Sequence, residues 1–176
     1  ITLMTGRLRV GDYIECDGIR GRVDSITYQS TQILTLDGCV IAFLNSSLFS
    51  KNFKNLTRNH GYEFTKLKVG VAYGTDVEHV RNLLKKALEV LYDYEKSGVP
   101  SIDKEKGINV LLNQLGDSSV DLYITLWALV EDKFRITGVA KEIVYNTLNE
   151  NNIEKLFGDP DIDDYNSIFD LGNKAG

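Results

Sequence analysis

The sequence predicts a mixed α+β protein, in which a small β-barrel domain precedes an αβ domain. Two Asp-Gly pairs, Asp17-Gly18 and Asp37-Gly38, separate short runs of β-forming residues near the N-terminus. Such a pair closes a tight hairpin because its residues adopt positive φ at low cost. After residue 61 the apolar pattern changes to alternating strand-like and helical segments. The 176 residues, 43% of them hydrophobic, suffice for one large domain or two small ones.

In the first half we expect five short strands, which at this spacing form a small, strongly curved barrel. Gly21 marks a point where the second strand can bend. The fourth strand is apolar enough to be buried on both faces, and the polar residues 45–47 after it predict a turn. We assign residues 7–60 to this domain, ending in a linker. The expected strands are 13–16, 19–26, 33–36, 39–44 and 53–57.

The second half, residues 61–156, predicts the order strand, helix, strand, strand, helix. Leu67, Val69 and Val71 alternate as in a half-buried strand, and residues 108–112 and 120–130 form the other two strands. This order is a split β-α-β arrangement that resembles ferredoxin-like folds. We expect both helices on one face of the sheet, with the aromatic residues Tyr123 and Trp127 on the other face.

Caps and helical spacing predict the two helices. Thr75 and Glu78 form a capping box at the start of the first helix, and Gly98 ends that helix. The apolar positions are Val77, Val80, Leu84, Leu88 and Leu91 in the first helix, and Phe134, Val139, Ile143, Val144 and Leu148 in the second.

Charge and cysteine content exclude several classes of protein. The formal net charge of −5 opposes a surface that grips a phosphate backbone, so we expect no nucleic-acid partner. Cys16 and Cys39 form no C-x-x-C pair, and the two histidines cannot complete a tetrahedral zinc site with them. We expect two buried thiols in a reducing compartment, with a disulfide as the alternative.

Motifs that carry chemistry are missing from the sequence. It holds no G-x-S-x-G elbow, no P-loop and no dinucleotide fingerprint. In the tail, Asp159, Asp161 and Asp163 stand at alternate places of a calcium loop, but Asp164 occupies the place that needs glycine. We therefore expect no enzymatic activity, no cofactor and no metal site.

The sequence contains no apolar run of about 18 residues and hence no expected membrane-spanning helix. It also shows no signal peptide. The chain begins with Ile1 rather than Met, so we expect a fragment whose upstream part has been removed.

Several short motifs, in order, resemble the small-conductance mechanosensitive channel family (MscS). Residues 8–14 (LRVGDYI), 18–23 (GIRGRV), 36–46 and 55–58 (NLTR) are similar to the Sm-like β domain of that family. Residues 69–76 (VGVAYGTD) and 115–120 (LGDSSV) are similar to the αβ domain that follows it there. The motif positions, for which the resemblance implies structural or subunit-contact roles, are Gly11, Asp12, Gly21, Asp37, Gly38, Asn45, Tyr73, Asp76, Gly116, Ser118, Ser119 and Ile162.

The resemblance implies a function. Members of the family are tension-gated channels of the bacterial inner membrane, and this segment corresponds to the cytoplasmic cage below the pore. Ions and small osmolytes pass through the cage on hypo-osmotic shock. Residues 1–6 are then the end of the pore helix or a tag, and residues 157–176 are a short C-terminal strand and tail. The implied assembly is a homo-oligomer, a heptamer by resemblance, joined to the membrane through upstream helices.

Two other functions remain open on the sequence. An Sm-like RNA-binding module fits the predicted barrel, although the acidic balance opposes it. A regulatory domain that binds a small ligand fits the ferredoxin-like half. For the channel cage, the acidic balance predicts a weak cation preference or none, because carboxylates raise the local concentration of cations.

Overall fold

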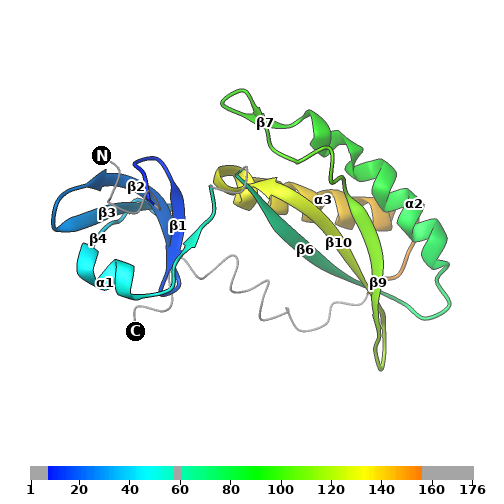
Figure 1. The fold of residues 1–176 in the computed structure, drawn as a ribbon. Helices are drawn as coiled ribbons and strands as arrows, with labels where there is room; N and C mark the ends of the chain where they lie inside the picture. The colour runs from blue at the N-terminus through cyan, green and yellow to red at the C-terminus, as the bar shows by residue number, and fades with distance from the viewer. Residues whose placement is uncertain (1–7, 58–60, 156–176) are drawn as a thin grey trace. The chain divides into compact units, whose positions relative to one another are not determined.

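The computed structural model describes residues 8–57 and 61–155, and the chain divides into two compact units between Gly61 and Tyr62 (Figure 1). The first unit contains a five-stranded antiparallel sheet, and the second contains two long helices and a three-stranded sheet. The expectation of an α+β chain with the β unit first is confirmed.

The sheet of the first unit has the strand order β4-β3-β2-β1-β5. Both Asp-Gly hairpins form, with positive φ at Asp17, Gly18 and Gly38. The core contains Ile14, Val23 and other apolar side chains from all of the longer strands. The elements are β1 (Tyr13–Cys16), β2 (Ile19–Ile26), β3 (Ser30–Thr35), β4 (Val40–Leu44), α1 (Asn45–Ser50) and β5 (Lys54–Asn55).

Gly21 is required where β2 passes close to β3. A Cβ atom at this position would lie 2.3 Å from Cγ2 of Ile33 and 2.6 Å from the carbonyl oxygen of Leu34. A register shift between Val23 and Ser25 follows in the same strand. The expected bend at Gly21 therefore coincides with a close approach that excludes any side chain.

Three expectations for the first unit differ from the structure. Strand β4 is not buried on both faces, since Val40 and Leu44 are 59% and 62% exposed. Residues 45–47 begin helix α1 rather than a turn, because Leu48 of that helix fills the core and Asn45 is itself buried. The final strand, expected at 53–57, is reduced to the two residues of β5.

The second unit follows the predicted order, with one additional hairpin. Its sheet is antiparallel, in the order β6-β10-β9. The elements are β6 (Tyr62–Val71), α2 (Val77–Leu88), the 3₁₀ helix η1 (Glu89–Asp93), β7 (Glu95–Lys96), β8 (Val99–Pro100), β9 (Asn109–Leu115), β10 (Val120–Leu129), the 3₁₀ helix η2 (Val130–Asp132) and α3 (Lys133–Glu150).

Both long helices pack on one face of this sheet, as predicted. Figure 1 shows α3 running behind β6 and β10. Alternate residues of β10, such as Leu122 and Ile124, form one continuous core with Leu84 of α2 and Ala140 of α3. The opposite face carries Tyr123, Thr125 and Trp127 of β10, which are only partly buried.

Local details of the helices differ from the expectations. Asp76, not Thr75, caps α2, since its side chain accepts a hydrogen bond from the N–H of His79 at 3.2 Å. Gly98 does not end the helix; with Ser97 it forms the positive-φ turn of the β7–β8 hairpin. In α3, Phe134 is 65% exposed, because the helix turns Ile136, Thr137 and Ala140 toward the core.

We expect Gly21→Ala to lower the free energy of unfolding by about 1–3 kcal/mol or more, because the added methyl group overlaps the backbone of β3. Urea titration followed by circular dichroism measures the change. Gly138→Ala is the control of opposite sign. Gly138 lies in α3 with open space around its Cβ position, so alanine should stabilise the helix by about 0.5–1 kcal/mol. A Gly21→Ala protein with an unchanged free energy of unfolding would contradict the close approach of Gly21 to β3.

We expect Thr137→Val to raise the free energy of unfolding by about 1 kcal/mol. Among the described residues, Oγ1 of Thr137 is the buried side-chain oxygen that has no hydrogen-bond partner. Valine keeps the shape and removes the unsatisfied group. Thr137→Ser, which keeps the hydroxyl and loses the methyl group, should instead destabilise. Thermal unfolding of both variants tests this, and equal effects of the two would be evidence against it.

Candidate functional site

The candidate functional features of this chain are sheet edges and the polar networks that position them. Within residues 8–57 and 61–155, His, Cys, Asp and Glu side chains nowhere form a group of three or more that could hold a metal ion. Cys16 is buried and Cys39 is exposed, both as free thiols, so the expectation of two buried thiols is wrong for Cys39. Burial and the neighbouring Asp17 raise the pKa of Cys16.

No helix in the described ranges combines the length and the apolar character needed to cross a bilayer.

Asp12 ties the turn before β1 to the edge strand β5. Gly11 lies in this turn and has a φ of 94°. Oδ2 of Asp12 accepts hydrogen bonds from the N–H of Arg9 at 3.0 Å and from the side-chain amide of Asn55 at 2.9 Å. Asn55 belongs to β5, so these two motif positions, Gly11 and Asp12, fix one edge of the sheet.

Asn45 holds the opposite side of the first unit. Its Oδ1 accepts a hydrogen bond from the hydroxyl of Thr31 at 2.7 Å, and its Nδ2 donates to the carbonyl oxygens of Thr27 and Tyr28 at 2.9 and 3.2 Å. The β2–β3 turn is thereby fixed to the end of β4. This buried amide uses both its acceptor and its donors, as a buried polar group must.

Asp37 and Gly38 form the β3–β4 turn. The hydroxyl of Thr35 donates to the carboxylate of Asp37, and this hydrogen bond lowers the pKa of Asp37. The same hydroxyl accepts from the N–H of Cys39 at 3.0 Å. The turn thus sets where β4 begins.

The outer edge of β4 offers backbone donors. The N–H of Thr35 donates to the carbonyl oxygen of Cys39, and the N–H of Asn45 to that of Gln29, each at 2.9 Å, at the two ends of the β3–β4 ladder. Antiparallel partners alternate between hydrogen-bonded and non-hydrogen-bonded pairs. The odd-numbered residues of β4 therefore bond to β3, and the N–H groups of the even-numbered ones, with Ala42 at the centre, point to the outer edge.

Three motif positions of the second unit, Tyr73, Gly116 and Ser119, meet at the β9–β10 turn. The hydroxyl of Tyr73 donates to the carbonyl oxygen of Gly116. The N–H of Gly116 donates to the carbonyl oxygen of Ser119 at 2.8 Å, and the hydroxyl of Ser119 donates to Asp121 at 2.8 Å. A Cβ atom at Gly116 would lie 3.1 Å from that Ser119 oxygen, so the turn is compact.

The remaining motif positions are not part of one site. Ser118 is exposed in the same turn, while Asp76 serves as the N-cap of α2. Ile162 lies outside the described residues, as do the expected C-terminal strand and the residues considered for calcium binding. The chain thus brings together Tyr73, Gly116 and Ser119, and separately Gly11 and Asp12.

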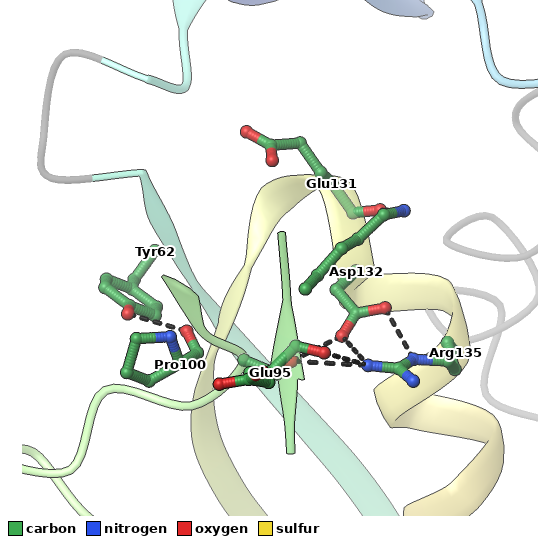
Figure 2. Close-up of polar contacts among 8 residues, drawn as sticks. Tyr62, Glu95, Pro100, Glu131, Asp132 and Arg135 are labelled. Atoms are coloured by element: carbon green, nitrogen blue, oxygen red, sulfur yellow. Dashed lines mark hydrogen bonds and ion pairs between the residues drawn. The ribbon is translucent and has the colours of Figure 1, made fainter. Parts of the chain in front are cut away.

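Sequence reasoning missed an ion pair between the buried Asp132 and the half-exposed Arg135 (Figure 2). Nε of Arg135 donates to Oδ1 of Asp132 at 2.8 Å, and Nη2 donates to Oδ2 at 2.6 Å. Nη2 also donates to the carbonyl oxygen of Glu95 at 2.9 Å, while the hydroxyl of Ser101 donates to Asp132. The only sequence signal for this pair is the three-residue spacing of Asp132 and Arg135 at the start of a helix. That spacing does not reveal that Glu95 and Ser101 lie beside the pair.

This network holds the β7–β8 hairpin against the start of α3. Nζ of Lys96 donates to the carbonyl oxygen of Glu131 at 2.9 Å. The hydroxyl of Tyr62 donates to the carbonyl oxygen of Pro100 at 2.7 Å (Figure 2). Burial, followed by the charge of Asp103, raises the pKa of Tyr62. The first residue of β6 is thereby fixed to the hairpin.

Electrostatics favour the ionised form of Asp132. Burial alone would raise its pKa, but hydrogen bonds from Arg135 and Ser101, and the charges of Arg135 and Lys96, outweigh burial and lower it. The carboxylate therefore stabilises the fold while it is ionised.

Two protein-family models match the chain. The model described as "Mechanosensitive ion channel, beta-domain" matches residues 1–58, and "Mechanosensitive ion channel MscS, C-terminal" matches residues 65–155. An uncharacterized MscS family protein of Synechocystis is 32% identical over 154 residues, which cover 88% of this chain and 49% of the relative. A small-conductance mechanosensitive channel of Helicobacter pylori is 29% identical over 163 residues, which cover 92% and 56%.

Solved structures show the same likeness. The crystal structure of Helicobacter pylori MscS in its closed state superimposes with a TM-score of 0.70 at 28% identity, covering 92% of this chain and 60% of that one. Arabidopsis thaliana MSL1 matches with a TM-score of 0.65 at 14% identity, which shows a shared fold alone. The chain spans about half the length of the Synechocystis and Helicobacter pylori relatives.

We expect Asp132→Asn to lower the free energy of unfolding at neutral pH by about 1–3 kcal/mol, because the hydroxyl of Ser101 and the guanidinium of Arg135 lose a charged acceptor. The folded-state pKa of Asp132 is lowered, so its stabilisation is complete above the unfolded-state value of about 3.9 and disappears as pH falls through the folded value.

Urea unfolding across this range measures the effect. The difference in free energy of unfolding between the wild type and Asp132→Asn should become smaller below about pH 4. Asp93→Asn, at an exposed carboxylate, is the matched control and should change little. A difference in free energy of unfolding that does not change with pH would refute the stabilising role of the Asp132 carboxylate.

Proposed function

This chain belongs to the mechanosensitive ion channel family MscS, and from that premise we propose that it forms the cytoplasmic cage of a membrane-tension-gated channel. In this proposal ions and small osmolytes leave through the cage during hypo-osmotic shock. The observation that carries the proposal is the presence of both family domains, in order, on one chain. The family is one of channels, not of enzymes.

The proposed assembly is a ring of identical subunits, a heptamer by family resemblance, attached to the bacterial inner membrane by upstream helices. The first unit supports it, because β4 and β5 are the two ends of one sheet and each pairs with a single neighbour among the described strands. If the β4 edge of one subunit meets the β5 edge of the next, the contact is head-to-tail, and it closes into a ring when the rotation per subunit fits.

The exposed side chains of β4 fit this contact. Val40 and Leu44 are more than half exposed, as is Leu36 just before the β3–β4 turn. Large apolar side chains beside a free strand edge favour pairing with another chain. Asp12 and Asn45, through the networks described above, would hold the two edges in the conformation that pairing needs.

We also propose the finer fold assignments, an Sm-like barrel and a ferredoxin-like unit. The curved five-stranded sheet with its close approach at Gly21 supports the first assignment. The order of β6, α2, β9, β10 and α3 supports the second. The net charge of −5 supports a weak cation preference of the cage, which single-channel recordings would test.

We expect Ala42→Pro to block ring assembly while leaving the β3–β4 ladder intact. Proline removes the outward N–H at the centre of β4, and edge strands tolerate proline on that side. In the full-length protein, light scattering in detergent should show loss of the oligomer. Cells that lack their own mechanosensitive channels should then survive osmotic downshock no better than cells without the protein.

Ala42→Thr is the matched control, because threonine keeps the N–H and suits a strand. It should assemble and protect cells as the wild type does. Circular dichroism establishes that Ala42→Pro remains folded. A folded Ala42→Pro protein that forms the normal oligomer and protects cells would contradict the proposed edge contact.

A further inference from the structure

We propose that the face of the second sheet opposite its helices binds free nucleoside phosphates. We call this surface the open sheet face and define it by one set of side chains, all from the second unit. The inference does not depend on the channel function or on subunit assembly. The set is Phe64, Lys66 and Lys68 of β6, Tyr123, Thr125 and Trp127 of β10, and Lys106 of the loop before β9.

Strand register gathers these side chains. Phe64 pairs with Trp127, Lys66 with Thr125, and Lys68 with Tyr123 across β6 and β10. The alternate residues of both strands, such as Leu67 and Ile124, point into the helix-covered core. The open sheet face therefore presents aromatic rings at two levels, with Lys66 between them and Lys68 opposite Tyr123.

The aromatic rings and the ammonium groups are already in contact. Nζ of Lys106 lies 3.5 Å from the ring centroid of Trp127, and Nζ of Lys66 lies 5.0 Å from that of Tyr123. Phe64, 49% exposed, meets Trp127 edge-to-face, with centroids 5.6 Å apart. In these cation–π contacts the ammonium groups lie over the ring faces, so a base that stacks there takes the place of a lysine.

A ligand that is both flat and anionic fits this surface best. A base can stack on an aromatic ring in place of a lysine, and the displaced ammonium group can move to a phosphate. An uncharged base would give up the cation–π contact without satisfying the ammonium group. Inorganic phosphate would leave the rings without a stacking partner. The geometry therefore selects a nucleoside phosphate.

Charge selects a free nucleotide over a nucleic-acid strand. The open sheet face carries Lys66, Lys68 and Lys106, and Asp121 lies 3.9 Å from the ammonium group of Lys68. The whole chain has a net charge of −5. A strand longer than this patch brings further phosphates, which the net negative charge of the chain repels.

Trp127 is the only tryptophan of the chain, so its intrinsic fluorescence reports binding directly. We expect ADP to change this fluorescence saturably, with a dissociation constant of about 1 mM or below. Adenosine and inorganic phosphate should each bind at least about tenfold more weakly than ADP. A short oligoadenylate should bind no more tightly than ADP.

Lys66→Gln combined with Lys68→Gln should weaken ADP binding by about tenfold, as expected when charged donors to phosphate are removed. Lys85→Gln combined with Lys86→Gln, on the exposed side of α2, is the control with equal charge and should bind ADP as the wild type does. Thermal unfolding checks that both variants fold. No saturable response, or equal loss in both double variants, overturns the proposal; tighter binding of oligoadenylate assigns the surface to single-stranded nucleic acid instead.

Discussion

The hydrogen-bonding demand of sheet edges is the constraint on which this chain depends. Each backbone N–H and C=O at an edge needs a partner or water. In the first unit β4 and β5 both end the sheet, and β4 carries exposed apolar side chains along its open edge. A β unit of this size buries little surface and is marginal by itself, so pairing between copies would stabilise it as well as build a ring.

The buried polar networks make sense as supports of those edges. Asp12 holds β5 through Asn55, and Asn45 holds the end of β4 against the β2–β3 turn. In the second unit, residues 153–155 return to the end of β6: the N–H of Ala72 donates to the carbonyl oxygen of Glu154 at 3.1 Å. A satisfied network of this kind fixes one geometry, because a partly broken one leaves buried groups unpaired.

Much of the fold could be predicted because local signals agree with global packing. The two Asp-Gly turns form, and the alternation of Leu122 and Ile124 marks the correct core face of β10. Gly21 was predicted as a bend from its residue type, and its contacts give the reason. Short-range chemistry decides all of these features.

The expectations that failed depend on contacts between distant segments. The apolar residues of β4 suggested burial on both faces, but its side chains remain exposed or partly exposed, and the described residues supply no partner that covers them. The hydrogen bonds from Ser101 to Asp132 and from Arg135 to Glu95 join residues more than thirty positions apart, which periodicity cannot reveal.

The number of copies in the full-length protein tests the central claim most directly. Native mass spectrometry of that protein in detergent gives the count. We expect a closed ring, because each β unit offers two different edges that can be used head-to-tail around one axis, with seven copies by family resemblance. A protein that stays monomeric, or that stops at a dimer, would contradict it.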